Sequence, residues 1–179
     1  MIKPTKKTSK KKVLKTIGTT DVIDLPEVGI FDVPCKIDTG ADTSAIHCDE
    51  VLVREIGGKR ILYFKLLDIN HPLYTGQELC TDRFKEKKVK SSFGKVADRF
   101  QVRLKVQIYG KKYLTNFNLS QRPEMNYPIL LGKRFLKNRF VVDVAQKDLN
   151  VAFKKNLDWV HFKSFLCKVL SIKMLFHTG

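Results

Sequence analysis

Residues 36–47 of the chain, KIDTGADTSAIH, have the types and spacing of a catalytic carboxylate held on a tight turn. Asp38 follows a short apolar run that is typical of a strand. Gly40 has no Cβ atom, so the backbone there can approach a substrate closely. An aspartate in this place can also simply close an Asx turn, and the segment alone leaves both interpretations open.

A second segment, ILLG at 129–132, favours the catalytic interpretation. It is a short apolar strand that ends in glycine, and KRFLKN after it indicates one or two helical turns. Such an element can pack beneath the loop that carries Asp38 and fix its geometry. The predicted chemistry is hydrolysis with two facing aspartates, of which one holds a proton and polarises a carbonyl while the other activates water as a base.

The number of these motifs predicts the assembly. The chain contains one Asp-Thr-Gly and no Asp-Ser-Gly, whereas a two-lobed, single-chain enzyme of this kind needs two copies. We therefore expect a homodimer in which two-fold symmetry supplies Asp38 from each chain. Thr39 would donate its hydroxyl into the partner's loop.

The elements that position these residues are expected to be mainly strands. The clearest is 99–108, where apolar residues alternate with basic and polar ones, and YGKK then turns into its hairpin partner. A C-terminal amphipathic helix is expected over 157–176. The predicted strands are two or three short ones within 19–37, then 60–69, 99–108, 113–119, 129–132, 139–145 and 149–153.

The charge is unevenly distributed along the chain. The formal net charge is +16, from 34 basic and 18 acidic residues, and no acidic residue precedes Asp21. The lysine-rich residues 1–16 are expected to form a disordered tail, followed by a folded domain over 17–156 and a C-terminal extension over 157–179. The basic excess favours nucleic acid or an acidic protein surface as a partner.

The cysteines and the apolar segments favour a cytoplasmic protein. The four cysteines are widely spread and form no CxxC pair, so reduced thiols are expected. No apolar stretch near the N-terminus has the length of a signal peptide. The apolar segment 160–176 contains three lysines, which argue against a membrane span.

The combination of IDTGADTSAIH with ILLGKRFL resembles the retropepsin-like aspartic proteases, and within them a bacterial group known as ATP-dependent zinc proteases. A VKSSFG segment, a basic strand and a late VVD extend the similarity from Val22 to Asp143. The resemblance implies a closed β-barrel with a short helix after ILLG. It also implies an aspartic endopeptidase, with Asp38 as its catalytic carboxylate and Thr39, Gly40 and Ala41 as its active-site loop.

The resemblance implies supporting roles around this loop. Gly132 would lie in the element beneath it. In retropepsins, an acid two residues after the loop glycine pairs with a base after the late glycine, so Asp42 is expected to pair with Lys133 or Arg134. The bacterial group frequently has a basic residue at the position of Asp42, and this sequence departs from that pattern.

The segment KVKSSFGKV at 88–96 lies between the two motifs, where a mobile flap is expected. Small and polar residues there suit a loop that closes over substrate. An ordinary basic β-turn is an equally open interpretation. The candidate flap residues are Lys90, Ser91, Ser92 and Gly94.

Neither zinc nor ATP has a recognisable site in this sequence. The HExxH motif of zincins is absent, and there is neither GxxxxGK[ST] nor a dinucleotide fingerprint. We therefore expect no metal and no cofactor. The histidines His47, His71, His161 and His177 are scattered, and core or surface roles are expected for them.

The resemblance implies a link to ATP-grasp ligases that add glutamate to proteins, and the trimming of such tails. Basic residues beside the expected flap would attract an acidic peptide. An alternative is a non-catalytic basic β-barrel that binds nucleic acid, a ribosome or an acidic peptide, with Tyr109, Tyr113 and Phe117 stacking on bases. That alternative leaves Asp-Thr-Gly and ILLG unexplained.

Overall fold

The computed structural model describes residues 13–90, 96–121 and 126–158. Within these residues, α1 (Lys133–Leu136) and a helix over 149–158 accompany eleven strands. The strands are β1 (Lys15–Ile17), β2 (Thr20–Leu25), β3 (Ile30–Asp38), β4 (Ser44–Ile56), β5 (Lys59–Leu66), β6 (Glu78–Thr81), β7 (Lys85–Lys90), β8 (Val96–Ile108), β9 (Lys111–Ser120), β10 (Ile129–Gly132) and β11 (Phe140–Val142).

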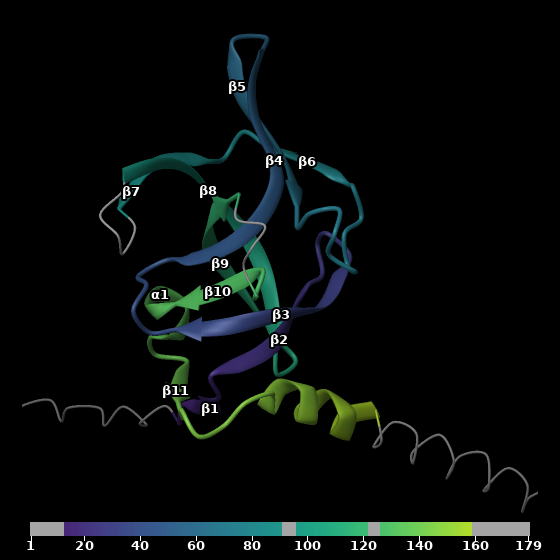
Figure 1. Cartoon of the computed structure of the whole chain (residues 1–179), viewed down its shortest axis with the longest axis vertical. Helices are drawn as coiled ribbons and strands as arrows, with labels where there is room; N and C mark the ends of the chain where they lie inside the picture. Colours follow the sequence, from purple (N-terminus) through teal and green to yellow (C-terminus); the bar gives the residue numbers. More distant parts are fainter. Residues whose placement is uncertain (1–12, 91–95, 122–125, 159–179) are drawn as a thin grey trace, which may run out of the picture.

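Six of the strands close into a β-barrel. They are hydrogen-bonded in the order β10-β3-β2-β8-β9-β4, and β4 pairs in turn with β10 to complete the ring (Figure 1). β10 runs parallel to β3, and β4 runs parallel to β9. The expected mainly β class, the closed barrel and the short helix after ILLG are confirmed.

The alternating pattern of β8 is confirmed by its burial. Val102, Val106 and Ile108 are at most 2% exposed, whereas Arg103 and Lys105 lie on the solvent face. Because side chains of a strand point alternately to its two faces, this pattern puts one face of the hairpin into the barrel interior.

Aromatic residues of the β8–β9 hairpin belong to the same core. Phe117 is 0% exposed and Tyr109 is 6% exposed. The ring of Tyr113 packs edge-on against Phe135 of α1 and Phe140 of β11. The nucleic-acid alternative requires these three hairpin aromatics to stack on bases. Because they pack in the core, they are not available for such stacking.

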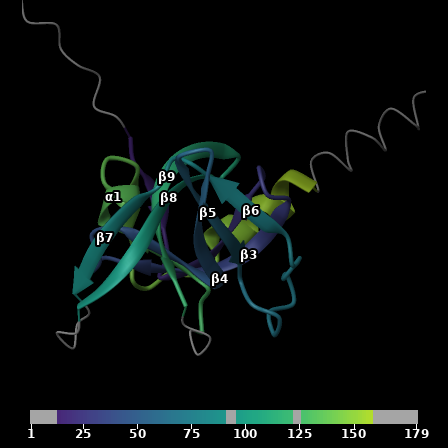
Figure 2. The same cartoon turned by 90° about the horizontal axis from the view of Figure 1, so that it is seen from above.

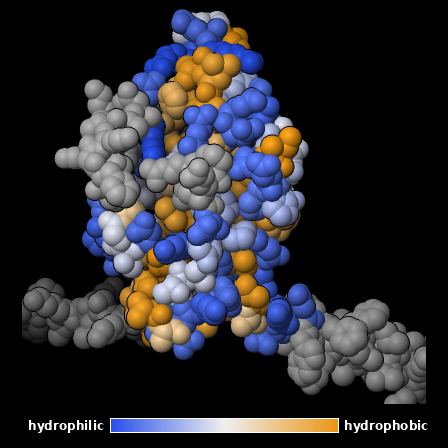
Figure 3. All heavy atoms as spheres, in the orientation of Figure 1, coloured by the Kyte–Doolittle hydropathy of each residue, from blue (hydrophilic) through white to orange (hydrophobic). Residues whose placement is uncertain are grey.

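β4 and β5 continue beyond the barrel as a two-stranded arm, which we define as residues 50–64 (Figure 1). Its turn consists of Gly57 and Gly58, which have φ values of +58° and +72°. Apolar surface lies near its tip (Figure 3), where Leu52 and Ile56 are about half exposed. The sequence predicted β5 but not the long strand β4.

β1 and β11 form a separate two-stranded parallel pair. Next to it, Gly18 passes so close to the chain at Gln146 that a Cβ atom on Gly18 would lie 2.4 Å from that carbonyl oxygen. The N–H of Thr19 donates to the same carbonyl at 2.8 Å. Residues 1–16 were predicted to be a tail, and residues 13–16 of this segment are described. β1 begins within it, at Lys15.

The helix over 149–158 corrects the prediction of a strand at 149–153. The buried carboxylate of Asp21 accepts the backbone N–H of Asn150 at its two oxygens, at 3.0 and 2.8 Å. Asn150 also donates to the carbonyl of Val22 and accepts the N–H of Tyr109. An anion that binds the first N–H groups of a helix favours the helix over the β-propensity of its residues.

This helix also crosses the predicted domain boundary at residue 156. Only residues 157 and 158 of the predicted C-terminal extension are described, and both are helical. α1 lies at the left of the barrel in Figure 1, and this helix lies beneath its lower end. Within the described ranges, neither helix has the length and apolar character needed to cross a bilayer.

Candidate active site

Asp38 is the last residue of β3, and the turn after it holds its carboxyl group. Oδ1 accepts the backbone N–H groups of Gly40 and Ala41, each at 3.0 Å. Asp38 is half-buried, whereas Thr39 and Gly40 are exposed. The carboxyl is therefore fixed in direction by the backbone and lies at the edge of the barrel, within reach of a molecule outside it.

Gly132, the last residue of β10, braces this turn from beneath. It pairs with Asp38 in the parallel register of β10 and β3, and its N–H donates to Ser44 Oγ at 3.1 Å. A Cβ atom on Gly132 would lie 2.8 Å from the carbonyl carbon of Thr43 and 2.9 Å from the carbonyl oxygen of Ala41. A glycine is required because the loop passes too close for a side chain.

Two further hydrogen bonds join the loop to the start of α1. The N–H groups of Lys133 and Arg134 donate to the carbonyls of Ala41 and Asp42, at 2.8 and 3.0 Å. Lys133 Nζ lies 2.9 Å from Asp42 Oδ1, and this ammonium holds the pKa of the Asp42 carboxyl below its ordinary value. Of the two expected bases, Lys133 is therefore the one that pairs with Asp42.

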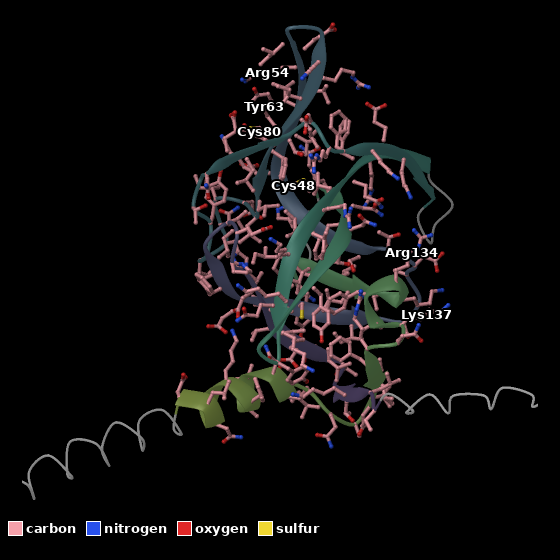
Figure 4. All side chains as sticks on the ribbon, turned by 180° about the vertical axis from the view of Figure 1, so that it is seen from behind. Cys48, Arg54, Tyr63, Cys80, Arg134 and Lys137 are labelled. Atoms are coloured by element: carbon pink, nitrogen blue, oxygen red, sulfur yellow. The ribbon has the colours of Figure 1, made fainter. Side chains whose placement is uncertain are left out.

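Arg134 is hydrogen-bonded to the loop through its backbone N–H, and its guanidinium adds to the positive charge that lowers the pKa of the Asp42 carboxyl. Its side chain and that of Lys137 are exposed on the outer side of α1 (Figure 4). No ion pair of either side chain is found within the described part of the chain. Both cations are therefore available to a partner or substrate.

The predicted flap falls in the hairpin of β7 and β8. Lys90 is the last residue of β7 and pairs with Val96, the first residue of β8. Ser91, Ser92 and Gly94 lie outside the described residues, so the flap stays a prediction. The described part of the hairpin lies on the same side of the barrel as α1 (Figure 1, Figure 2).

Three polar residues around the site were not singled out as functional from the sequence. Ser44 accepts the hydrogen bond from Gly132, and His47 and Asp68 form a close pair with 2.7 Å between Nε2 and Oδ2. Ser44 lies in the TSA stretch directly after the loop, which is the one available signal. Asp68 lies 21 residues from His47, and no sequence spacing connects them.

Metal-ligating side chains are not grouped in the described residues. No set of three or more His, Cys, Asp or Glu side chains there is arranged to hold a metal ion. His71 accepts the N–H of Leu73 at 3.1 Å, a bond within its own loop.

Relatives by sequence include proteins much longer than this chain. It is 28% identical over 135 residues to a Desulfotalea psychrophila protein named probable alpha-L-glutamate ligase. It is 25% identical over 134 residues to a Shewanella halifaxensis protein of the same name. Each match covers 73% of this chain and 28% of the relative, so the chain spans little more than a quarter of their length.

The folded domain is also similar to a solved structure and to a family model. A crystal structure of a Legionella pneumophila protein of unknown function superposes with a TM-score of 0.56 at 21% identity, over 75% of this chain and 96% of that one. A family model described as retropepsin-like aspartic endopeptidase RimB matches residues 16–152. With the Asp38 turn and the Gly132 brace, this match shows that the chain belongs to the RimB-like family of retropepsin-like aspartic endopeptidases.

Proposed function

We propose that two copies of this chain form an aspartic endopeptidase in which both Asp38 carboxyls share one water. Two carboxyls so close do not both ionise, so one keeps a proton. The ionised carboxylate takes a proton from the water, and the resulting hydroxide oxygen attacks the carbonyl carbon of the scissile bond. The protonated carboxyl polarises the carbonyl oxygen and gives it a proton. When the tetrahedral intermediate collapses, the C–N bond breaks and the leaving amine takes the proton that the other carboxyl accepted from water.

The observation that carries this proposal is the way the loop holds Asp38. Two backbone N–H groups fix one carboxyl oxygen, and no other hydrogen bond to this group is found within the described residues. The second oxygen is left for a water or a substrate. The brace at Gly132 keeps the turn in one conformation, which is the pre-organisation that catalysis requires.

Exposure of the loop supports the dimer. Thr39, Gly40 and Asp42 are all exposed, although one carboxyl alone cannot supply both the acid and the base. A second copy facing this edge would cover the loop and supply the missing carboxyl.

We further propose that the substrate is an acidic peptide, such as a glutamate tail on a protein. The relatives named probable alpha-L-glutamate ligase contain a segment similar to this domain, which supports a functional link with a ligase that makes such tails. The exposed cation Arg134 lies in α1, which follows Gly132, and the exposed cation Lys137 lies directly after this helix. Their field would raise the local concentration of an acidic peptide.

The decisive experiment compares the wild-type chain with Asp38→Asn on a protein that bears a short glutamate tail. We expect the wild type to shorten the tail, as read by mass spectrometry. Asp38→Asn should lose at least about 1,000-fold in rate, because its amide cannot act as the base. Asp158→Asn, an exposed change at the far helix, serves as the control.

Two outcomes would contradict the proposal. Equal activity in Asp38→Asn would exclude Asp38 as the base. Loss of activity on removal of divalent metal by a chelator would indicate metal-dependent hydrolysis instead. Sedimentation of Asp38→Asn should still give a dimer, because the change is isosteric.

A further inference from the structure

His47, nine residues after Asp38, is hydrogen-bonded through each of its backbone and side-chain polar atoms. Its N–H donates to the carbonyl of Pro128 at 2.7 Å, and its carbonyl accepts the N–H of Leu67 at 3.0 Å. Nδ1 lies 3.1 Å from the carbonyl of Ser120, and Nε2 lies 2.7 Å from Asp68 Oδ2. The residue is 5% exposed, so this buried junction connects β4 to three other segments of the chain.

Both ring nitrogens of His47 face acceptors. A carbonyl oxygen cannot donate, and an ionised carboxylate cannot donate either. The geometry is therefore satisfied by an imidazolium ring with a proton on each nitrogen and Asp68 as its counter-ion. The N–H of Asn70 donates to the other oxygen of Asp68 at 2.7 Å, which fixes the carboxylate in place.

The backbone next to Asp68 adopts an unfavourable conformation to present it. Leu67 is fully buried and has a φ of +67°, in the region that residues with a side chain rarely adopt. Such a conformation persists only where surrounding contacts impose it. Here the contacts are the hydrogen bond from Leu67 to His47 and the pair between His47 and Asp68.

The segments joined by His47 lead to the proposed catalytic residues. Pro128 immediately precedes β10, which ends at Gly132 beneath Asp38. Ser120 ends β9, and its hydroxyl accepts a hydrogen bond from Arg99 of β8 at 3.0 Å. His47 thus fixes β4 between β9 and β10, directly after the strand leaves the Asp38 loop.

We propose that the His47–Asp68 pair is a positioning pair for the reaction at Asp38. It sets the register in which β4 and β10 meet, and through Ser44 and Gly132 it sets the position of the Asp38 turn. This inference rests on the proposed peptidase function for its kinetic readout and on the protein alone for its structural readout.

The test compares Asp68→Ala with Asp68→Asn. Alanine removes the carboxylate that faces Nε2, so we expect kcat to fall by about 10- to 100-fold while KM changes by less than about two-fold. Asparagine can donate its amide N–H to Nε2 of a neutral ring, whose Nδ1–H still donates to Ser120. Asp68→Asn should therefore stay within about three-fold of the wild-type kcat.

A structural measurement keeps this test independent of activity. In ¹⁵N-labelled protein, Asp68→Ala should shift the amide signals of Gly40, Ala41 and Gly132, and Asp68→Asn should restore them. Glu27→Ala, which breaks the exposed ion pair with Lys105, is the control and should leave them unchanged. If the wild type cleaves no substrate, these signals still decide whether the pair positions the loop.

The ring signals of His47 give the last measurement, which works even if Asp68→Ala does not fold. We expect two N–H groups on the ring in the wild type and only Nδ1–H in Asp68→Asn. The same neutral ring in both proteins would overturn the pair. Unshifted amides, or an unchanged kcat in a folded Asp68→Ala, would overturn its positioning role and leave the peptidase proposal intact.

Discussion

The distance between the Asp38 turn and β10 is set by single atoms. The N–H of Gly132 donates to Ser44, and the space that a Cβ atom would need is already occupied by backbone atoms of Ala41 and Thr43. Backbone cannot move aside as the end of a long side chain can. The position of the turn therefore depends on the absence of a side chain at Gly132.

Gly132→Ala should push the loop away from β10. We expect the free energy of unfolding to fall by about 1–3 kcal/mol, the usual cost of overpacking, and the peptidase activity to be lost. Urea denaturation gives the first quantity. Gly58→Ala is the control, because its φ of +72° would also strain an alanine, but in the turn at the tip of the β4–β5 arm, away from the Asp38 loop (Figure 1). A stability loss without displaced Gly40 and Ala41 amides in Gly132→Ala would argue against the brace.

Asp68 should also contribute to stability in a pH-dependent way. Its hydrogen bond from the N–H of Asn70, together with the pair with His47, lowers the pKa of its carboxyl from the ordinary value of 3.8. A lowered pKa gives stability that is present above pH 3.8 and is lost as the pH falls through the folded-state pKa.

Thermal unfolding of wild type and Asp68→Asn from pH 6 to pH 2.5 checks this. We expect the difference between the two melting temperatures to shrink as the pH falls below about 4. A difference that stays constant down to the lowest pH would show that the pKa of Asp68 is the same in the folded and the unfolded protein.

Among the elements, the helix over 149–158 depends on one buried polar residue. Asn150 is 0% exposed, and burial raises the pKa of the Asp21 carboxyl that accepts its N–H. Asn150→Ala leaves the N–H of Tyr109 and the carbonyl of Val22 without these partners. Each buried group left unpaired costs about 1–3 kcal/mol.

We therefore expect Asn150→Ala to lower the free energy of unfolding by roughly 2–4 kcal/mol, measured by urea denaturation. Asn156→Ala in the exposed part of the same helix should change it by less than about 0.5 kcal/mol. Equal effects of the two changes would mean that the helix is not held by Asn150.

Elements with a clean local pattern could be predicted from the sequence. The alternation in β8, the short apolar run of β10 and the helical turn after it all appear in the structure. β4 was missed because polar and charged residues interrupt its pattern, and half of it lies in the exposed arm. The strand predicted at 149–153 failed because the contact between Asp21 and Asn150 outweighs local propensity.

At the scale of the whole molecule, some contacts of the site could be predicted from the sequence and others could not. The Asp38 loop and Gly132 are contiguous motifs, and the parallel pairing of β3 with β10 brings them together as expected. The pair of Asp42 with a base after Gly132 could also be predicted. The contact between His47 and Asp68 could not, because it depends on the path of the loop after β5 and not on spacing.

The burial of each cysteine predicts whether its thiol reacts in the native protein. Cys35 and Cys48 are fully buried, and Cys80 of β6 is exposed (Figure 4). Burial raises the pKa of Cys48 to about 12 and raises that of Cys35 as well, so neither forms the reactive thiolate near neutral pH.

Iodoacetamide at pH 8, followed by peptide mapping, should modify the peptide of Cys80 in the native protein and leave those of Cys35 and Cys48 unmodified. In urea, all three should react. Native labelling of Cys48 as fast as Cys80 would show that the barrel opens locally at β4.

The pairing of β1 with β11 joins residues 15–17 to residues 140–142. The hydroxyl of Thr19 and the carbonyl that it contacts in Gln146 lie 127 residues apart. Closing so long a loop in an unfolded chain costs entropy, which is offset by three paired residues in each strand and by the burial of Ile17 and Phe140. We expect the barrel to form first and to bring β1 and β11 together. We expect this contact to form last and to be lost first, so unfolding should begin with separation of β1 from β11 while the barrel that carries Asp38 is still closed.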